Sequence, residues 1–331
     1  MRQAWAALLL LAGPVLADAP ASPTPVELSL VSEHVIAGMA RGNLSGLAQC
    51  GDALWAVSDR DDHSLYRLAT QASPWQAEAI DFQPPSVPDS GLPWGLRVRT
   101  WVMSFIRGGD LDFEGLSCDA QGSAYLVSEA HAAVLKVPVS GSPEWLRLSP
   151  SLVRQARGSG MLLHFNALFE GVAVNGAGDH LWLAAERERR GLLVVKRQQT
   201  AWDCEGGCVL LSEAGTEPLP AQMNSSRQAS RDFSDLAYFN GKLFTLERNA
   251  YQICRRNAQT AALEQCWSFA AEALAPQRRY DQPFGLAEAL VVDASGAWVG
   301  LDNNEGARAD GERRPVVWRF AAPAGGWGAV P

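Results

Sequence analysis

A two-part phrase recurs five times along this chain. Each copy starts with small or acidic residues that lead into a short apolar strand, and a second apolar strand follows that ends in an acid. The copies begin at Leu44, Phe113, Phe169, Phe233 and Leu286. A repeat of tens of residues that is built from strands is typical of a radial or solenoidal array. A radial array would bring acids at equivalent repeat positions to one axis.

The strands of each copy fit the blade of a β-propeller. Each copy continues into a third strand that carries a basic residue, such as Leu193–Arg197, and most copies leave room for a fourth strand. Four antiparallel strands per repeat is the propeller blade. The fifth copy ends after Phe320, whereas the N-terminal strand Val26–Ile36 has no copy of its own. Pairing these two segments would complete the last blade and cover two exposed strand edges.

We therefore predict an all-β fold, a five-bladed β-propeller that is closed by the N-terminal strand. The alternative is a sixth blade within Gln83–Gly109, although that segment is short for four strands and also suits a short helix.

The N-terminus resembles a secretory signal. Arg2 precedes an apolar run from Ala4 to Leu16, and small residues stand before a cleavage point after Ala17. We expect a signal peptide over residues 1–17 and a single propeller domain over residues 18–331, periplasmic or secreted. The run is too short to span a bilayer comfortably, so we expect no membrane anchor.

The charge balance limits the partners of the chain. The net charge is −8 and the pI is about 5.2, which argues against nucleic acid because non-specific binding needs a basic face. We expect a monomer that acts on a small molecule.

Six cysteines fit an oxidising compartment. Cys204 and Cys208 flank a turn-forming spacer, and Cys254 and Cys266 lie on two strand-like runs joined by a polar connection, so both pairs are predicted disulfides. Cys50 and Cys118 follow the first strands of copies one and two, and adjacent blades would place them together.

Acids near the start of the first strands form one candidate site. Because the first strand of a propeller blade lines the central channel, these acids would surround one opening, with Ser45 in the first copy. They are Glu114, Glu170, Asp235 and Glu288. Clustered carboxylates repel unless they share protons or hold a cation, and hard oxygen ligands without His or Cys favour Ca²⁺. The structural alternative is an acid that bonds backbone N–H groups in a turn.

A second column of acids ends the second strands: Asp59, Glu129, Glu186, Glu247 and Asp302. Asp302 and Asn303 supply further oxygens suited to calcium. Arginines follow three of these acids and could bind a phosphate or carboxylate in bidentate fashion; they are Arg60, Arg187 and Arg248. The alternative, which the sequence slightly favours, is a belt of salt bridges between blades.

Several phrases together resemble a known family. They are Phe-Glu-Gly-Leu-Ser at Phe113–Ser117, Phe-Glu-Gly-Val-Ala at Phe169–Ala173, Leu-Trp-Ala-Val-Ser-Asp at Leu54–Asp59, Phe-Thr-Leu-Glu-Arg-Asn at Phe244–Asn249 and Leu-Asp-Asn-Asn at Leu301–Asn304. In this order they resemble the phytase-like domain family ("esterase-like activity of phytase") from about Val26 to Phe320. The resemblance implies an exported β-propeller related to calcium-dependent propeller phytases, which hold phosphate through several Ca²⁺ ions in an acidic channel.

The leading functional prediction is a calcium-binding hydrolase that acts on an anionic phosphate ester. The metal ligands would be Glu114, Glu170, Asp235, Glu288, Asp302 and Asn303. Glu170 would be the most important acid in catalysis, and Arg187 and Arg248 would clamp the anion. One alternative is a lactonase or arylesterase in which a channel Ca²⁺ polarises a carbonyl group. The other is a non-catalytic periplasmic scaffold or binding protein whose acids are structural.

Overall fold

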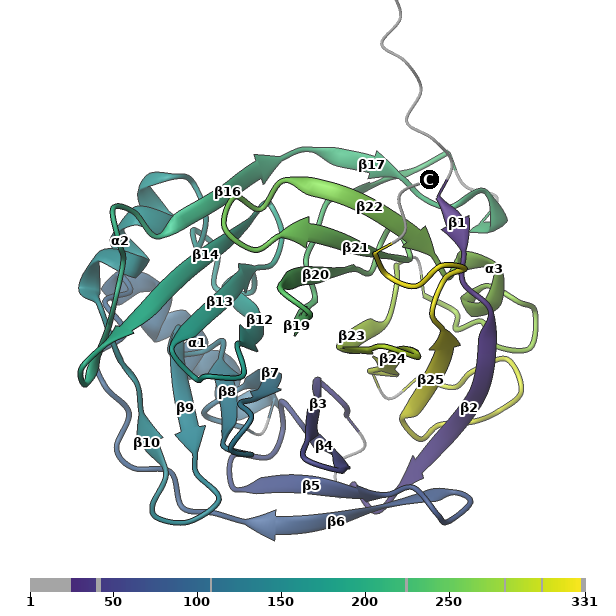
Figure 1. The fold of residues 1–331 in the computed structure, drawn as a ribbon, viewed down its shortest axis with the longest axis horizontal. Coiled ribbons are helices and arrows are strands. Elements are labelled where there is room, and N and C mark those ends of the chain that lie inside the picture. Colours follow the sequence, from purple (N-terminus) through teal and green to yellow (C-terminus); the bar gives the residue numbers. More distant parts are fainter. Residues whose placement is uncertain are drawn as a thin grey trace, which may run out of the picture.

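The computed structural model describes residues 25–39, 43–107, 109–223, 226–282, 284–304 and 306–328, and the predicted signal peptide lies outside them. Within these residues, five inner strands surround one axis (Figure 1). They are β3 (Gly46–Cys50), β7 (Phe113–Cys118), β12 (Phe169–Val174), β19 (Asp235–Phe239) and β23 (Ala287–Asp293). Each inner strand contacts the next, and β23 contacts β3, so the ring is closed. The predicted five-bladed β-propeller is confirmed.

The blades extend outward from these inner strands, and we number them from β3. Blade 1 adds β4 (Ala53–Val57), β5 (Ser64–Ala69) and β6 (Trp75–Asp81). Blade 2 adds β8 (Ala124–Ser128), β9 (Ala133–Val137) and β10 (Glu144–Trp145). Blade 3 adds β13 (His180–Ala185) and β14 (Arg189–Gln198). The long β14 strand pairs with both β15 (Ala201–Asp203) and β16 (Val209–Ala214), and β11 (Arg147–Leu148) pairs with β15. Blade 4 adds β20 (Lys242–Glu247), β21 (Gln252–Asn257) and β22 (Leu263–Ser268).

Blade 5 is completed by the N-terminal segment. Its own strands are β23, β24 (Gly296–Leu301) and β25 (Val316–Ala321), and β2 (Leu30–Ala37) pairs antiparallel with β25. The same β2 strand pairs parallel with β6 of blade 1, and β1 (Val26–Glu27) pairs parallel with β22 of blade 4. The N-terminal segment therefore closes the ring as predicted and also joins three blades along their outer edges.

Connections between blades hold the remaining elements. They are α1 (Trp94–Arg107), α2 (Pro150–Gly158), the β17–β18 hairpin (Thr216–Pro218 and Gln228–Ser230), the 3₁₀ turn η1 (Ala221–Met223) and α3 (Ala270–Ala273). The described residues of the segment from Gln83 to Gly109 form α1 and no strand, which excludes the sixth blade there. No helix in the described ranges combines the length and apolarity needed to span a membrane.

Glycine in the repeated phrase lets neighbouring inner strands approach closely. A Cβ atom on Gly46 would lie 2.9 Å from the backbone nitrogen of Leu116, and one on Gly115 would lie 2.7 Å from the carbonyl oxygen of Glu170. A Cβ on Gly171 would lie 2.8 Å from the Cα of Asp235. These neighbours are backbone atoms, which cannot move aside as a flexible side chain can. The glycines are therefore needed for the inner ring to close tightly.

All six cysteines form disulfides, in the predicted pairs. Cys50–Cys118 joins the ends of β3 and β7, and thus blades 1 and 2. Cys254–Cys266 links paired positions of β21 and β22 in blade 4, whereas Cys204–Cys208 closes a short turn in blade 3.

Candidate functional site: carboxylates at the propeller axis

Three of the inner strands carry a bulge, and a glutamate occupies each bulge. The pairing register shifts between Phe113 and Gly115, between Phe169 and Gly171, and between Ala287 and Ala289. The residues left out of the ladder are Glu114, Glu170 and Glu288. A bulge adds one residue that has no partner on the neighbouring strand, and it changes the direction in which the side chain of that residue points. The inner strands of blades 2, 3 and 5 thus each contribute one acid at the same level of the ring.

The other two inner strands have serine at this level. In β3 and β19 the pairing is regular, and the residues just before it, Ser45 and Ser234, donate their backbone N–H to the carbonyls of Val57 and Leu246. Ser234 is therefore the counterpart of Glu170, and Asp235 is the counterpart of Gly171.

Asp235 accordingly stands one position away from the acid column in which the sequence analysis put it. Its carboxylate is fully buried and its Oδ2 accepts a hydrogen bond from the backbone N–H of Leu290 at 2.7 Å. That contact supports β23 of the next blade and matches the structural alternative. Burial raises the pKa of Asp235 well above its usual range.

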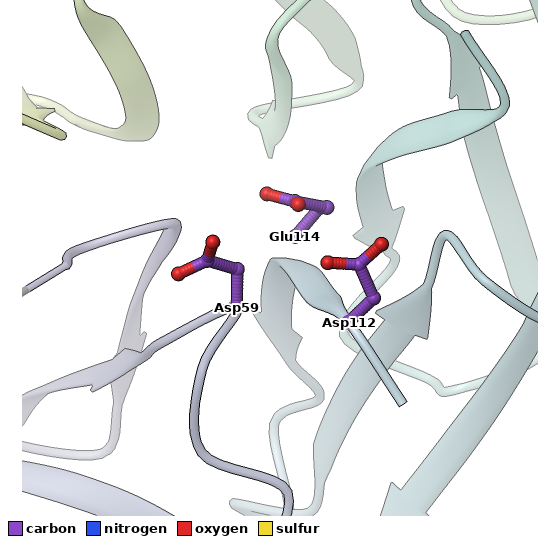
Figure 2. Close-up of side chains that lie close together, drawn as sticks. All are labelled: Asp59, Asp112 and Glu114. Atoms are coloured by element: carbon purple, nitrogen blue, oxygen red, sulfur yellow. The ribbon is translucent and has the colours of Figure 1, made fainter. Parts of the chain in front are cut away.

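Three acids from blades 1 and 2 converge beside the axis (Figure 2). Asp59, Asp112 and Glu114 each place one carboxylate oxygen within 4.8 Å of the other two; we call this group cluster I. Asp59 ends the second strand of blade 1, and Glu114 occupies the bulge of β7. Burial, followed by the negative charges of Asp112 and Asp59, raises the pKa of Glu114 well above its usual range.

Asp112 was missed by the sequence analysis. It precedes β7 with a φ of 56°, a left-handed conformation that aspartate tolerates better than most residues. Asp232 stands in the same place before Phe233, so a repeated Asp-Phe pair was the signal that could have identified both acids.

Amide and carboxylate oxygens of Asn43, which precedes β3, and of Asp302 and Asn303, which follow β24 of blade 5, continue cluster I. Asn43 donates from Nδ2 to Oδ2 of Asp302 at 3.4 Å and to Oδ2 of Asp59 at 3.5 Å. The amide oxygens of Asn43 and Asn303 are buried and accept no hydrogen bond from the described residues. Burial raises the pKa of Asp302 to about 7. A set of carboxylate and amide oxygens without His or Cys fits a hard cation such as Ca²⁺.

A second group, cluster II, lies where blades 2 and 3 meet. Glu129, Glu170 and Glu186 are buried and place one carboxylate oxygen each within 4.8 Å of the others. Burial raises the pKa of Glu170 well above its usual range, and the charge of Glu186 adds to this effect. Burial also raises the pKa of Glu186. The protonated forms of Glu170 and Glu186 are therefore more favoured here than they would be in water.

Arg248 lies among the acids of three blades. It donates from Nε to Oδ2 of Asp232 at 2.7 Å, from Nη2 to Glu186 and from Nη1 to Glu288. Burial raises the pKa of Glu288 to about 8, although Arg248 acts against this shift. Arg187 donates to Glu186 and to the carbonyl oxygen of Asn166. Arg248 thus makes the contacts between blades that the salt-bridge alternative expects, whereas the contacts of Arg187 stay within blade 3.

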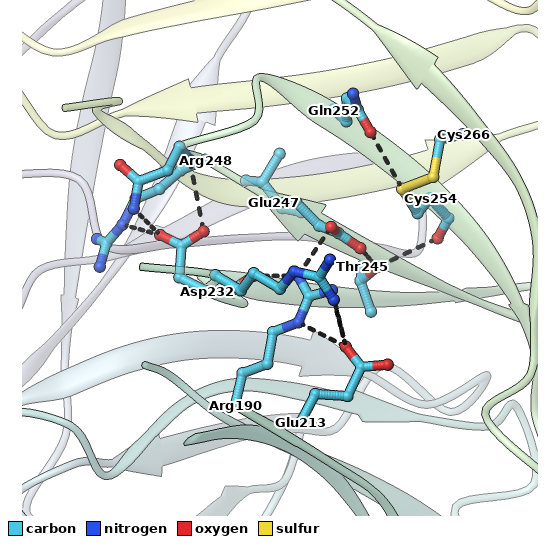
Figure 3. A network of polar contacts seen from close by, with 12 residues as sticks. Arg190, Glu213, Asp232, Thr245, Glu247, Arg248, Gln252, Cys254 and Cys266 are labelled. Carbon is cyan, nitrogen blue, oxygen red and sulfur yellow. Dashed lines mark hydrogen bonds and ion pairs between the residues drawn. A yellow bond between two sulfur atoms is a disulfide. The ribbon is translucent and has the colours of Figure 1, made fainter. Parts of the chain in front are cut away.

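Glu247, the second-column acid of blade 4, is paired with arginines in a network that continues through Arg190 and Asp232 to Arg248 (Figure 3). It accepts hydrogen bonds from Arg190 at 2.8 Å and from Arg256 at 2.9 Å. Although burial acts in the opposite direction, these arginines hold the pKa of Glu247 below its usual range. This acid is neutralised internally, whereas clusters I and II concentrate like charges.

Among solved structures, the chain is similar to the glutaminyl cyclase of Myxococcus xanthus, with a TM-score of 0.48 and 10% identity over 90% of this chain and 97% of that one. It is similar to the PQQ-bound aldose sugar dehydrogenase of Streptomyces coelicolor, with a TM-score of 0.44 and 12% identity over 90% and 100% of the two chains. For virginiamycin B lyase of Staphylococcus aureus the TM-score is 0.38, with 9% identity over 85% and 66%.

No curated protein sequence matches the chain. The family profile described as "Phytase-like: Esterase-like activity of phytase" matches residues 40–318, which is most of the chain and includes the five inner strands and both acid clusters. The protein belongs to the phytase-like family.

Proposed function

We propose that this protein is a calcium-binding hydrolase of phosphate esters that works at the propeller axis. The observation that carries the proposal is cluster I, in which Asp59, Asp112 and Glu114 from two blades bring their carboxylates within 4.8 Å. Like charges this close are unfavourable in a partly buried place unless a cation or protons compensate them.

The ligand set that we propose differs in part from the one expected from the sequence. Asp59, Asp112 and Glu114 would hold the ion, and the amide oxygens of Asn43 and Asn303 with Asp302 would complete the oxygen shell. Asp235 is left out because its carboxylate supports Leu290. A calcium ion in this place would neutralise the charge of a phosphate ester and polarise its phosphoryl group.

Cluster II would supply the proton chemistry. Burial and the charge of Glu186 raise the pKa of Glu170, which favours the protonated form that could deliver a proton to a leaving alkoxide. Glu186 accepts hydrogen bonds from Arg187 and Arg248, which favour its charged form. Two neighbouring carboxyl groups with different environments are the arrangement that separates an acid from a base.

One observation favours a second candidate function. Arg187 and Arg248 are already engaged by protein oxygens, so a neutral ester or lactone would meet less competition than a phosphate. In that case the same acids and cation would act on a carbonyl group.

A substrate panel separates these candidates. We expect calcium-dependent release of phosphate from phytate or p-nitrophenyl phosphate, which EDTA abolishes, and a loss of about 10² to 10⁴ in turnover for Glu170→Gln. Asp52→Asn, an exposed acid in a turn of blade 1, is the matched control and should keep full activity. Proton release from lactones without phosphate release would support the second candidate. No turnover of either class would contradict both.

A further inference from the structure

The helix α1 presents its large apolar side chains to solvent. Trp94 is 76% exposed, Trp101 is 62% exposed and Phe105 is 72% exposed. Between Trp94 and Phe105, the residues that α1 buries are Leu96, Thr100 and Ser104, which recur every four residues and include two small polar side chains. Bulky aromatic residues outside and small polar residues inside reverse the usual pattern of a surface helix. Such an apolar face on a globular domain is the mark of a binding surface.

The exposed tryptophans form one wall of a pocket, the α1 pocket, with a volume of about 970 Å³. Pro84, Pro85, Val87 and Pro88 of the preceding loop form another wall. Rigid prolines and indole rings offer flat apolar surfaces at a small cost in conformational entropy. A concave pocket of this size, with apolar walls and polar residues between them, is suited to a small molecule.

Three of the charged groups of the pocket, Asp62, Asp89 and Arg97, already have partners in the protein. Asp62 accepts hydrogen bonds from the backbone N–H groups of Asp110 at 2.6 Å and Leu111 at 2.9 Å. Asp89 pairs with Arg97 at 3.1 Å. Burial lowers the pKa of His131, which favours its neutral form near pH 7. The pocket therefore selects a ligand through apolar contact rather than through charge.

The floor of the α1 pocket adjoins both acid clusters. Asp110 and Leu111 line it, and the next residue along the chain is Asp112 of cluster I. Ala130 and His131 line it as well, and the residue before them is Glu129 of cluster II. The lining of the pocket is thus continuous along the chain with residues of both clusters.

We propose that the α1 pocket binds an aromatic ring of a small molecule whose polar end lies over the axial acids. The tryptophans would stack on the ring, and the proline wall would cover its other side. That this molecule is the substrate rests on the hydrolase function proposed above; the binding of an aromatic ring does not. An aromatic ester would cover the apolar walls of the pocket, whereas a highly charged polyol phosphate would leave these walls exposed to water.

Calorimetric titration of the EDTA-treated protein with 1-naphthol tests the binding directly, because neither a metal nor turnover is involved. We expect saturable binding at one site, and none with myo-inositol at the same concentrations. Trp101→Ala should weaken the affinity at least about tenfold, and Trp101→Phe should weaken it less. Trp101 is largely exposed, so its removal leaves the core intact, and an unchanged melting temperature verifies this.

Phe284→Ala is the matched control. Phe284 is also an exposed aromatic residue, 42% exposed, but it lines a different pocket of about 490 Å³ between blades 4 and 5. Its removal should leave the affinity for 1-naphthol unchanged. Absence of saturable binding, or a loss in Phe284→Ala instead of Trp101→Ala, would overturn the proposal. So would dimerisation or vesicle binding that depends on Trp101 while 1-naphthol does not bind.

A comparison of two phosphate esters tests whether the α1 pocket contributes to catalysis. With calcium present, kcat/KM for 1-naphthyl phosphate should exceed that for glycerol 2-phosphate, and Trp101→Ala should remove most of this preference. If 1-naphthol binds through Trp101 but neither ester is hydrolysed, the pocket stands and the hydrolase proposal fails. If both esters are hydrolysed equally and 1-naphthol does not bind, the hydrolase stands and the pocket proposal fails.

Discussion

Arg248 donates its Nε hydrogen to Oδ2 of Asp232 at 2.7 Å, within blade 4 of the propeller. The remaining nitrogens of the same guanidinium group reach Glu186 in blade 3 and Glu288 in blade 5. One buried cation therefore connects three blades at the axis and compensates acids that burial alone would protonate.

Removal of this cation should destabilise the fold strongly. We expect Arg248→Met to lower the free energy of unfolding by about 3–5 kcal/mol, because it leaves buried carboxylates without their partner. Urea denaturation of the metal-free protein measures the change. The control is Arg314→Met, which removes an exposed pair with Glu312 and should cost less than about 1 kcal/mol. Equal stability of the two variants would show that Arg248 does not hold the blades together.

The axial acids should make the metal-free protein less stable as the pH rises. The folded-state pKa is about 6 for Asp232, about 7 for Asp302 and about 8 for Glu288, each above the usual value. Protonated forms of these acids are favoured in the folded state, so their stabilising effect is complete below about pH 4 and is lost as the pH rises through 6 to 8.

The melting temperature in EDTA should therefore fall between pH 5 and pH 8. Asp310 and Glu312 have a lowered pKa of about 2. They lose their stabilising effect only in more acidic solution, so they do not change the melting temperature between pH 5 and pH 8. Calcium should offset the fall at pH 8, because it binds the ionised carboxylates of the native state. A melting temperature that rises from pH 5 to pH 8 in EDTA would refute this account of the axis.

The disulfide between blades 1 and 2 should matter more than the one within blade 4. Cys50–Cys118 spans 68 residues, whereas Cys254–Cys266 spans 12. In the chain-entropy description this difference makes the first bond worth about 1.5 kcal/mol more. Thermal melting of the two double Cys→Ser variants compares them. A larger loss for the Cys254–Cys266 variant would mean that native contacts, rather than loop closure, decide the effect.

The repeat made much of this architecture predictable. Spacing and strand pattern were enough for the five blades, the closing N-terminal strand and the Cys50–Cys118 pair, because each follows from equivalent positions in successive copies. Asp235 was misplaced by one position because a sequence does not reveal which inner strands are bulged. Asp112 was overlooked because it precedes the strand instead of ending one.

Contacts that depend on three blades at once were the hardest to predict. The sequence showed Arg248 beside an acid column, but only the closed ring determines that Asp232, Glu186 and Glu288 share its guanidinium group. The α1 pocket likewise depends on how a long connection folds back over the turns that follow β4 and β8.

Arg187 offers a test of substrate charge. Its side chain is 30% exposed and donates to Glu186 and Asn166, so it can still approach an anion near cluster II. We expect Arg187→Ala to raise KM for a phosphate ester about tenfold and to leave KM for a neutral lactone nearly unchanged. Steady-state kinetics on both substrates decides this. Equal damage to both would point to lost structure between blades instead of lost anion binding.

The central claim is that the acids at the propeller axis hold calcium, and the most direct test is an anomalous difference map from crystals grown with Ca²⁺. We predict a calcium peak among the carboxylates of Asp59, Asp112 and Glu114, and its disappearance in crystals of Glu114→Gln grown in the same solution. A map with no peak at these carboxylates, or with calcium only at exposed surface acids, would contradict the account.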